Sequence, residues 1–247
     1  MPITGADNQL RDGAEVRPQG APTARDDLPL DRAVITLRPL GSPVGLGLFG
    51  LAAATFTLAG LQLGWVGPGE GSTVGLVLIG FAAPAQLLAS VLAFLARDAV
   101  VGTAMAVLSL TWLSAGLVLA TSPPGARSGA LGLLLLVSGV AVGLTGITGT
   151  LSKLATGAVL LTAAVRIGLT GVFQLSGQEW LKTTSGVLGV LLALLALAVA
   201  WGSELEDAGA PFGLPLGRRG KGAQAVQGSL REQVSGVATE PGVRTSL

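Results

Sequence analysis

The sequence predicts an all-α, polytopic membrane protein with six transmembrane helices, and two observations carry this prediction. Only 12% of the 247 residues are charged and 50% are hydrophobic, whereas about 25% of the residues of a soluble domain are charged. The charges fall mainly in residues 1–42, in residues 204–247 and in short breaks between long apolar runs. The centre of the chain is therefore expected to lie in lipid.

Six apolar stretches are long enough to cross a bilayer, because a spanning helix needs about 20 consecutive apolar residues. We expect spans at residues 43–64, 73–95, 99–120, 129–150, 154–175 and 181–201. These divide the chain into an N-terminal cytoplasmic tail, residues 1–42, a six-helix transmembrane domain, residues 43–203, and a C-terminal cytoplasmic tail, residues 204–247. Both tails lack an apolar period and are expected to be mostly disordered.

The ends of the expected spans carry aromatic and polar residues. Trp65, Trp180 and Trp201 fall at span ends, where amphipathic rings sit well at the level of the lipid headgroups. The fourth and fifth spans are separated only by Leu151-Ser152-Lys153. Many of the 38 glycines lie inside spans, and small residues let helix backbones approach closely in lipid. This predicts a compact helical bundle.

Orientation follows from the basic residues, because lysine and arginine near span ends favour the cytoplasmic side. With six spans, both tails lie on one side together with the breaks that contain Arg97 and Lys153, and the other side carries only Arg127 and Lys182. This predicts that both termini are cytoplasmic and that the protein lies in the cytoplasmic (inner) membrane. Residues 1–42 contain no apolar core of the signal-peptide type, so we expect the N-terminus to be retained.

The composition excludes several classes of function. Histidine and cysteine are absent, which removes thiolate and imidazole metal sites, disulfides and catalysis by cysteine or histidine nucleophiles. We therefore expect no enzyme activity, no metal and no cofactor. The formal net charge is +1, from 15 basic and 14 acidic residues, so nothing favours a nucleic-acid partner.

Arg166 lies near the middle of the fifth expected span, where an arginine costs about 2.5 to 3.5 kcal/mol. Glu70, Asp98 and Glu179 all lie at span ends, so no acidic partner is expected at its depth. A guanidinium without a fixed counter-ion can hold a carboxylate with two parallel hydrogen bonds. We take Arg166 as a candidate substrate-binding residue. The alternative is that it reaches toward the headgroups or bonds helix carbonyls.

Pro84 and Gln86 stand out in the second expected span. Proline removes a backbone donor and displaces the carbonyl of Gly80, so a kink is expected there. The amide of Gln86 can both donate to and accept from a carboxyl group, which makes Gln86 a second substrate-binding candidate. The alternative is that this amide bonds another helix.

Polar side chains within the third to fifth spans are mostly hydroxyls, and Thr111 is a further substrate-binding candidate. The alternative for each hydroxyl is a bond to a carbonyl of its own helix. Trp112 lies deep in its span, where it either lines a cavity or packs closely. No Asp or Glu occurs at mid-membrane depth. A proton that accompanies a substrate should therefore travel on the substrate or through water.

The start of the first span carries a resemblance to a known family. Ser42-Pro43-Val44-Gly45-Leu46-Gly47-Leu48 resembles the signature Asn-Pro-Ala-Pro-Leu-Gly-Leu of the acetate uptake transporter family. Ala85-Gln86, Arg97-Asp98, Trp112, Gly149-Thr150-Leu151 and Gly202 follow in the family's order. The resemblance covers residues 43–207, with all six spans and neither tail. It identifies the chain as a divergent member.

This resemblance implies six helices around a central pathway, both ends cytoplasmic, and a hexamer with a pathway in each protomer. It also implies that Ser42 and Pro43 contact substrate. The family narrows its pathway with a phenylalanine, a tyrosine and a leucine, and the matching positions here are Leu51, Leu108 and Ala164.

The departures from the family concern the pathway itself. The signature asparagine is Ser42 here, its second proline is Gly45, and both aromatic constrictions are aliphatic. A polar contact for the substrate is lost at each of these positions. Arg166, two residues from Ala164, would bring a charge to the same level, so the substrate can differ from acetate.

The leading hypothesis is a membrane channel or proton-linked transporter for acetate or a similar small monocarboxylate, surrounded by membrane lipid and assembled as a homo-oligomer. A pore for a small neutral solute is favoured by the glycine-rich fourth helix and disfavoured by Arg166. A non-transporting membrane scaffold whose tails bind partners is equally compatible with the packing glycines. An enzyme is the least supported, since no catalytic constellation is visible.

Overall fold

The computed structural model describes residues 41–210, 212–220 and 223. Its helices are α1 (Val44–Gln62), α2 (Gly71–Val77), α3 (Ala83–Leu95), α4 (Ala99–Thr121), α5 (Gly129–Gly149), α6 (Leu154–Ser176) and α7 (Glu179–Asp207). A 3₁₀ turn, η2 (Pro68–Glu70), precedes α2, and a π-helical segment, η3 (Leu78–Ala82), joins α2 to α3. The second span is therefore one continuous stretch, Pro68–Leu95. The disorder expected for residues 1–40 and 224–247 lies outside the described residues.

Six helical stretches are long and apolar enough to cross a membrane, which confirms the predicted all-α fold with six spans. Each predicted span overlaps one of them. The largest differences are at the start of the second span, which begins at Pro68 instead of residue 73, and at the end of α7, which continues to Asp207 instead of residue 201. The second span begins early because a proline fits the first turn of a helix, where its missing N–H is not needed. The end of α7 extends because Glu204 and Leu205 continue the helix beyond the apolar run.

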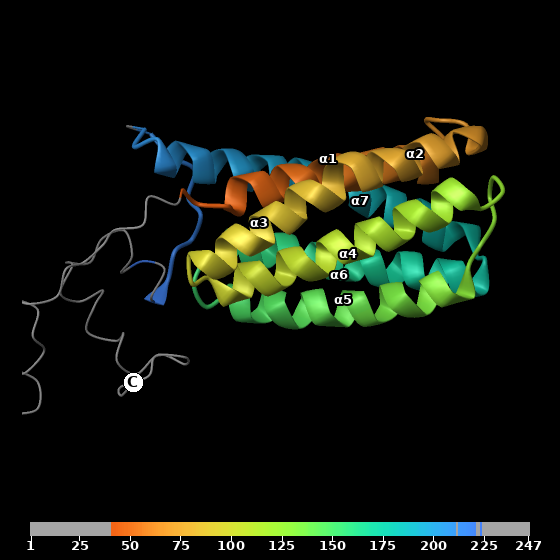
Figure 1. The fold of residues 1–247 in the computed structure, drawn as a ribbon. Helices are drawn as coiled ribbons and strands as arrows, with labels where there is room; N and C mark the ends of the chain where they lie inside the picture. The colour runs from red at the N-terminus through yellow and green to blue at the C-terminus, as the bar shows by residue number, and fades with distance from the viewer. Residues whose placement is uncertain (1–40, 211, 221–222, 224–247) are drawn as a thin grey trace, which may run out of the picture. The chain divides into compact units, whose positions relative to one another are not determined.

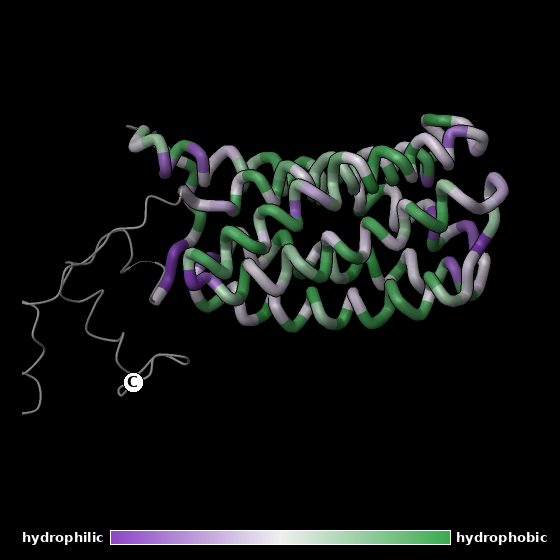
Figure 2. The backbone as a smooth tube through the Cα atoms, in the orientation of Figure 1, coloured by the Kyte–Doolittle hydropathy of each residue, from purple (hydrophilic) through white to green (hydrophobic). Residues whose placement is uncertain are grey.

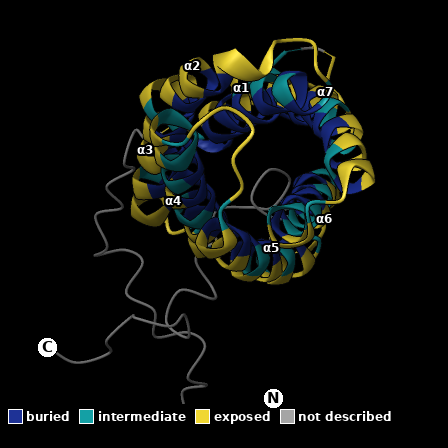
Figure 3. Cartoon of the chain, turned by 90° about the vertical axis from the view of Figure 1, so that its right-hand side faces the viewer, coloured by how far each residue is buried: buried dark blue, intermediate teal, exposed yellow. Residues whose placement is uncertain are grey.

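The spans pack side by side in chain order, and the last packs on the first. Each helix contacts its neighbour in sequence, and α7 also packs along α1. Viewed end-on, the helices stand in a closed ring (Figure 3). The start of α1 and the end of α7 lie at the same end of the bundle (Figure 1). We call this the near end, and we call the opposite end, with the turns after α1, α4 and α6, the far end.

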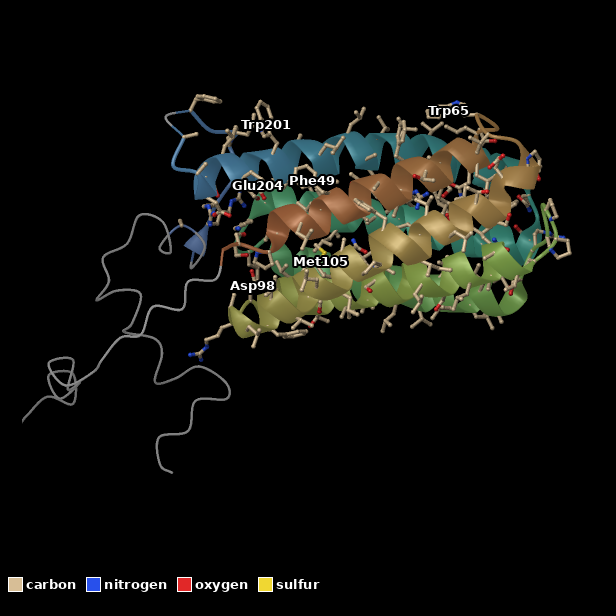
Figure 4. All side chains as sticks on the ribbon, turned by 45° about the horizontal axis from the view of Figure 1, so that its top comes forward. Phe49, Trp65, Asp98, Met105, Trp201 and Glu204 are labelled. Atoms are coloured by element: carbon tan, nitrogen blue, oxygen red, sulfur yellow. The ribbon has the colours of Figure 1, made fainter. Side chains whose placement is uncertain are left out.

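The helices carry apolar residues both on the inside of the ring and on its outer surface. Figure 3 shows buried residues facing the inside and exposed residues on the outside. The exposed positions of the helices are nevertheless large and apolar, as at Val137 and Leu191, and in the view of Figure 2 hydrophobic residues run along the helices while the hydrophilic ones lie mainly at the two ends. A helix that is apolar all round is suited to a lipid environment. Trp65 and Trp201 are exposed at opposite ends of the bundle (Figure 4), as expected for headgroup anchors.

Glycine allows α5 and α6 to approach closely. A Cβ atom on Gly157 would lie 2.8 Å from the backbone nitrogen of Thr150 and 3.0 Å from the carbonyl oxygen of Gly146, whereas one on Gly168, in the same helix, would meet nothing within 4 Å. We expect Gly157→Ala to lower the free energy of unfolding by about 1–3 kcal/mol because the helices must separate. Gly168→Ala, the matched control, should leave stability unchanged or slightly raised. Thermal unfolding followed by circular dichroism checks this, and equal effects of the two variants would contradict it.

The second span changes its helical pitch at mid-membrane. Its π-helical segment η3 ends at Ala82, two residues before Pro84 in the first turn of α3. Proline cannot donate to the carbonyl four residues earlier, and a π-helical turn is a common way to absorb such a gap. Ser109 of α4 donates to the carbonyl of Ala83 at 2.8 Å, so one carbonyl beside the proline is bonded across the bundle.

Part of the chain that the sequence groups with the C-terminal tail packs on the near end. Leu216 is buried, and the backbone nitrogens of Leu154 and Ala155 donate to the carbonyls of Gly217 and Leu216, both at 3.1 Å. Arg218 donates to the carboxylate of Glu206. These bonds tie residues 212–220 to the start of α6, because the first amides of a helix otherwise lack partners.

Candidate functional site

The bundle contains a cavity of about 380 Å³ that reaches from its middle to the turns at the far end. Its lining residues on α1, α4 and α6 begin at Leu58, Trp112 and Arg166, and those of α5 go no deeper than Leu135. We call this space the far-end cavity, and the level of Trp112 and Arg166 its floor. Both floor residues lie near the middle of their helices, so the floor lies near the membrane midplane.

The guanidinium of Arg166 is buried at this floor and is held from α1. The side chain is 1% exposed. Its Nη2 donates to the carbonyl of Thr55 at 3.4 Å and to Oε1 of Gln62 at 3.3 Å. The guanidinium carbon lies 5.7 Å from the centroid of the Trp112 ring, within the range of a cation–π interaction. The alternative in which Arg166 bonds a helix carbonyl is thus realised at one of its nitrogens.

The other two nitrogens of Arg166, Nε and Nη1, form no such hydrogen bonds with the described residues. Its Nε is buried without a hydrogen-bond partner, and a Cβ on Gly189 of α7 would lie 2.7 Å from it. Glycine at this position is therefore what lets the guanidinium fit against α7. Its Nη1 donates to no group among the described residues, and no acidic side chain there forms a salt bridge with Arg166. The positive charge therefore has no counter-ion among the described residues.

Gln62, which accepts from Arg166, belongs to a polar cluster with Thr170 and Ser185. Nε2 of Gln62 donates to Oγ1 of Thr170 at 3.4 Å and to Oγ of Ser185 at 3.5 Å, and the two hydroxyls lie 2.5 Å apart. Thr170 also donates to the carbonyl of Arg166 at 3.0 Å. The cluster joins α1, the first helix, to α6 and α7, the last two helices. Gln62 and Ser185 were missed by sequence reasoning because only the closure of the ring brings them together, while Thr170, one turn after Arg166, was visible as a hydroxyl.

Two of the three predicted constriction residues lie just beyond the floor, on its near-end side. Leu51 and Leu108 are both fully buried, one helical turn before Thr55 and Trp112 in their helices. Ala164 lies elsewhere, because a Cβ on Gly143 of α5 would contact it at 3.5 Å. It therefore packs between α5 and α6. The structure thus brings two of the three predicted positions to the level at which the cavity ends.

The remaining predicted site residues do not line the far-end cavity. Ser42 and Pro43 lie at the near end, where the carbonyl of Pro43 accepts from the backbone of Gly47. Gln86 is fully buried in the near-end half, and its Nε2 donates to the carbonyl of Gly47 at 3.3 Å while its Oε1 has no partner. Thr111 donates to its own helix at the carbonyl of Val107 and lies 3.0 Å from Oγ of Ser138. The amide of Gln86 thus bonds another helix, which is the alternative to substrate binding that the sequence leaves open for this residue.

The mouth of the cavity is predominantly basic. Arg127, Glu179 and Lys182 line it, and the ammonium of Lys182 lies 3.1 Å from the carboxylate of Glu179. Two positive groups therefore face one negative group at the mouth, with Arg166 at the floor. Such an arrangement raises the local concentration of anions, because a low-dielectric wall focuses the field of its charges.

Comparison with known proteins finds a solved structure that has the same fold. No family model matches the sequence, and no curated protein matches it. Among solved structures, the chain is similar to that described as the bacterial acetate channel SatP, with a TM-score of 0.63 and 23% sequence identity over 72% of this chain and 99% of that chain. The ring of six helices therefore has the fold of this channel structure.

Proposed function

We propose that the chain is a membrane channel or proton-linked transporter for acetate or a similar small monocarboxylate. The observation that carries the proposal is Arg166: a buried cation at mid-membrane, at the floor of an open cavity, with no acidic partner among the described residues. A charge placed so deep is costly and is characteristic of a pathway for the opposite charge. The shared fold with the bacterial acetate channel supports a carboxylate as that charge.

The pathway follows from the order of the parts. An anion enters the far-end cavity between Arg127 and Lys182, reaches Arg166, and then passes Leu51 and Leu108 toward the near end. The sequence has no Asp or Glu within the middle of any span, so the protein has no carboxylate there to relay a proton. If protons accompany the flux, they cross on the neutral acid or through water.

Orientation and assembly complete the proposal. The near end carries Arg97, Lys153, Arg218 and Arg219, and the far end carries Arg127 and Lys182. We propose that the protein lies in the cytoplasmic membrane. Because basic residues favour the cytoplasmic side, the near end then faces the cytoplasm. The far-end cavity then faces outward. By resemblance to the acetate uptake transporter family, we expect a homo-hexamer with one pathway in each protomer.

Flux of labelled acetate into liposomes that contain the purified protein tests this function. At pH 8 almost all acetate is ionised, because carboxyl pKa values lie near about 4, so leakage of the neutral acid is small. We expect acetate entry that an inside-positive potential accelerates and that other short carboxylates inhibit. Protein-free liposomes are the control.

Two outcomes would favour the rival functions. Glycerol permeation at the same rate as acetate, with no response of acetate entry to the membrane potential, would favour a pore for neutral solutes. The absence of flux for any small acid, in protein that is correctly inserted, would favour a membrane scaffold.

A further inference from the structure

The far-end cavity is much larger than acetate. Its volume of about 380 Å³ falls within the range of about 300–1,000 Å³ that is typical of pockets for drug-sized ligands. Acetate takes up roughly the room of two water molecules, about 60 Å³. A site that served acetate alone would leave most of this space to solvent.

The cavity has a polar floor and apolar walls. Large apolar residues from four helices, among them Leu58, Leu119, Leu135 and Phe173, form much of its sides, and Gln62, Thr170 and Gln174 add polar groups to the lining. A ligand of matching shape would carry one charged group at its deep end and an apolar body that points toward the far end. Burial of apolar surface of this kind strengthens binding in proportion to the area removed from water.

Two N–H donors are available for the charged group. The hydrogen bonds that Arg166 donates among the described residues use Nη2 and not Nη1, and Nε1 of Trp112 is buried without a partner among them. A buried donor without an acceptor costs about 1–3 kcal/mol, so an acceptor at the floor is favoured. The guanidinium carbon lies 5.7 Å from the centroid of the indole ring. Both residues line the floor of the cavity, and a carboxylate placed there can accept from one of them with each oxygen, at about 2.9 Å from the nitrogen.

We infer that the far-end cavity is a binding site for monocarboxylates with an apolar tail of about three to seven carbons, a size within the range of its volume. The carboxylate lies between Arg166 and Trp112, and the tail lies along the leucine walls. This inference rests on the proposed function in that both use Arg166 to hold a carboxylate. It goes further by assigning a preference for acids larger than acetate.

Fluorescence of Trp112 measures binding at this site directly. The chain has four tryptophans, and Trp65, Trp180 and Trp201 are more than half exposed, so replacing these three with phenylalanine leaves Trp112 as the only reporter. The protein in lipid nanodiscs is titrated with acetate, butyrate and hexanoate at pH 8. Each methylene removed from water tightens binding by about fourfold, so we expect the dissociation constant of hexanoate to be at least tenfold lower than that of acetate.

Two variants of the single-tryptophan protein separate head and tail. Arg166→Gln should remove the saturable response to hexanoate, and hexanol, which has the tail without the charge, should give no saturable response. Ala115→Leu fills the cavity wall, since Ala115 is buried and lines the cavity. It should cut the preference for hexanoate over acetate at least fivefold. Leu117→Ala, on the exposed side of α4, is its control.

The outcomes distinguish the inference from the proposed function. Equal affinity for acetate and hexanoate in the single-tryptophan protein would overturn the inference even if no variant folded, because that comparison needs no further substitution. Saturable binding of hexanol, or binding of hexanoate that survives Arg166→Gln, would also overturn it. Acetate flux without a chain-length preference leaves the proposed function standing alone. Hexanoate binding without acetate flux leaves the binding site standing and removes the proposed transport of acetate.

Discussion

Acetate entry is expected to fall by about two to three orders of magnitude when Arg166 is replaced by glutamine. At the membrane midplane little else offsets the loss of solvation of an anion, and a unit charge 4 Å away contributes about 4 kcal/mol at an effective dielectric constant of 20. Glutamine keeps a polar group near Thr55 and Gln62 but removes the charge. Arg166→Lys should give an intermediate rate, because it restores the charge without the forked donors that match a carboxylate.

The measurement is potential-driven entry of labelled acetate into liposomes with equal amounts of each variant. Val165→Ala, next to Arg166 but on the exposed side of α6, should behave as the unmodified protein. Circular dichroism and elution volume establish that each variant is folded. Unchanged flux through correctly folded Arg166→Gln would show that the arginine braces α1 and α6 and does not attract the substrate.

Replacing Leu108 with alanine is expected to raise acetate flux severalfold and to lower stability. Leu108 is fully buried one turn beyond the floor, where no cavity lining is found on α4. Removing its side chain widens the narrowest proposed step of the pathway. The same change leaves a space in a packed core, which costs about 2–5 kcal/mol for a buried leucine. Flux and stability should therefore move in opposite directions.

The matched variant is Leu110→Ala, which removes the same atoms from a position of α4 that is 58% exposed. It should change neither flux nor the unfolding midpoint by a comparable amount. Both are measured in the same liposomes and detergent. A loss of stability at Leu108 with no gain in flux would place the pathway away from α4, and the assignment of Leu108 as a constriction would be wrong.

The six spans could be predicted because their signal is local. A stretch of about 20 apolar residues is sufficient to recognise a spanning helix, and the expected span at residues 99–120 differs from α4 (Ala99–Thr121) by one residue at its end. The packing of α7 on α1 could not be predicted in this way. It depends on contacts between residues more than a hundred positions apart, such as Thr55 and Gly189, for which the sequence carries no periodic signal.

The candidate site could be predicted where a single polar or charged residue interrupts an apolar span. An arginine in the middle of an apolar run is costly wherever the helices pack, so the sequence alone singles out Arg166. Gln86 also interrupts an apolar span, yet its amide bonds the carbonyl of Gly47. An intramembrane polar group satisfies itself on whichever helix is nearest, and that helix is a property of the fold. The roles of Ser42, Pro43, Gln86 and Thr111 in substrate contact remain predictions.

The cavity that stops halfway through the bundle also decides where a transmembrane voltage acts. Because water conducts, an opening that is continuous with one bulk phase carries that phase's electrical potential down to Arg166. Nearly the whole field then falls across the dry stretch beyond Leu108. Moving one charge through that stretch involves about 2.3 kcal/mol per 100 mV, whereas reaching Arg166 involves little. Voltage should thus control release of the anion far more than its capture, and the current should rectify.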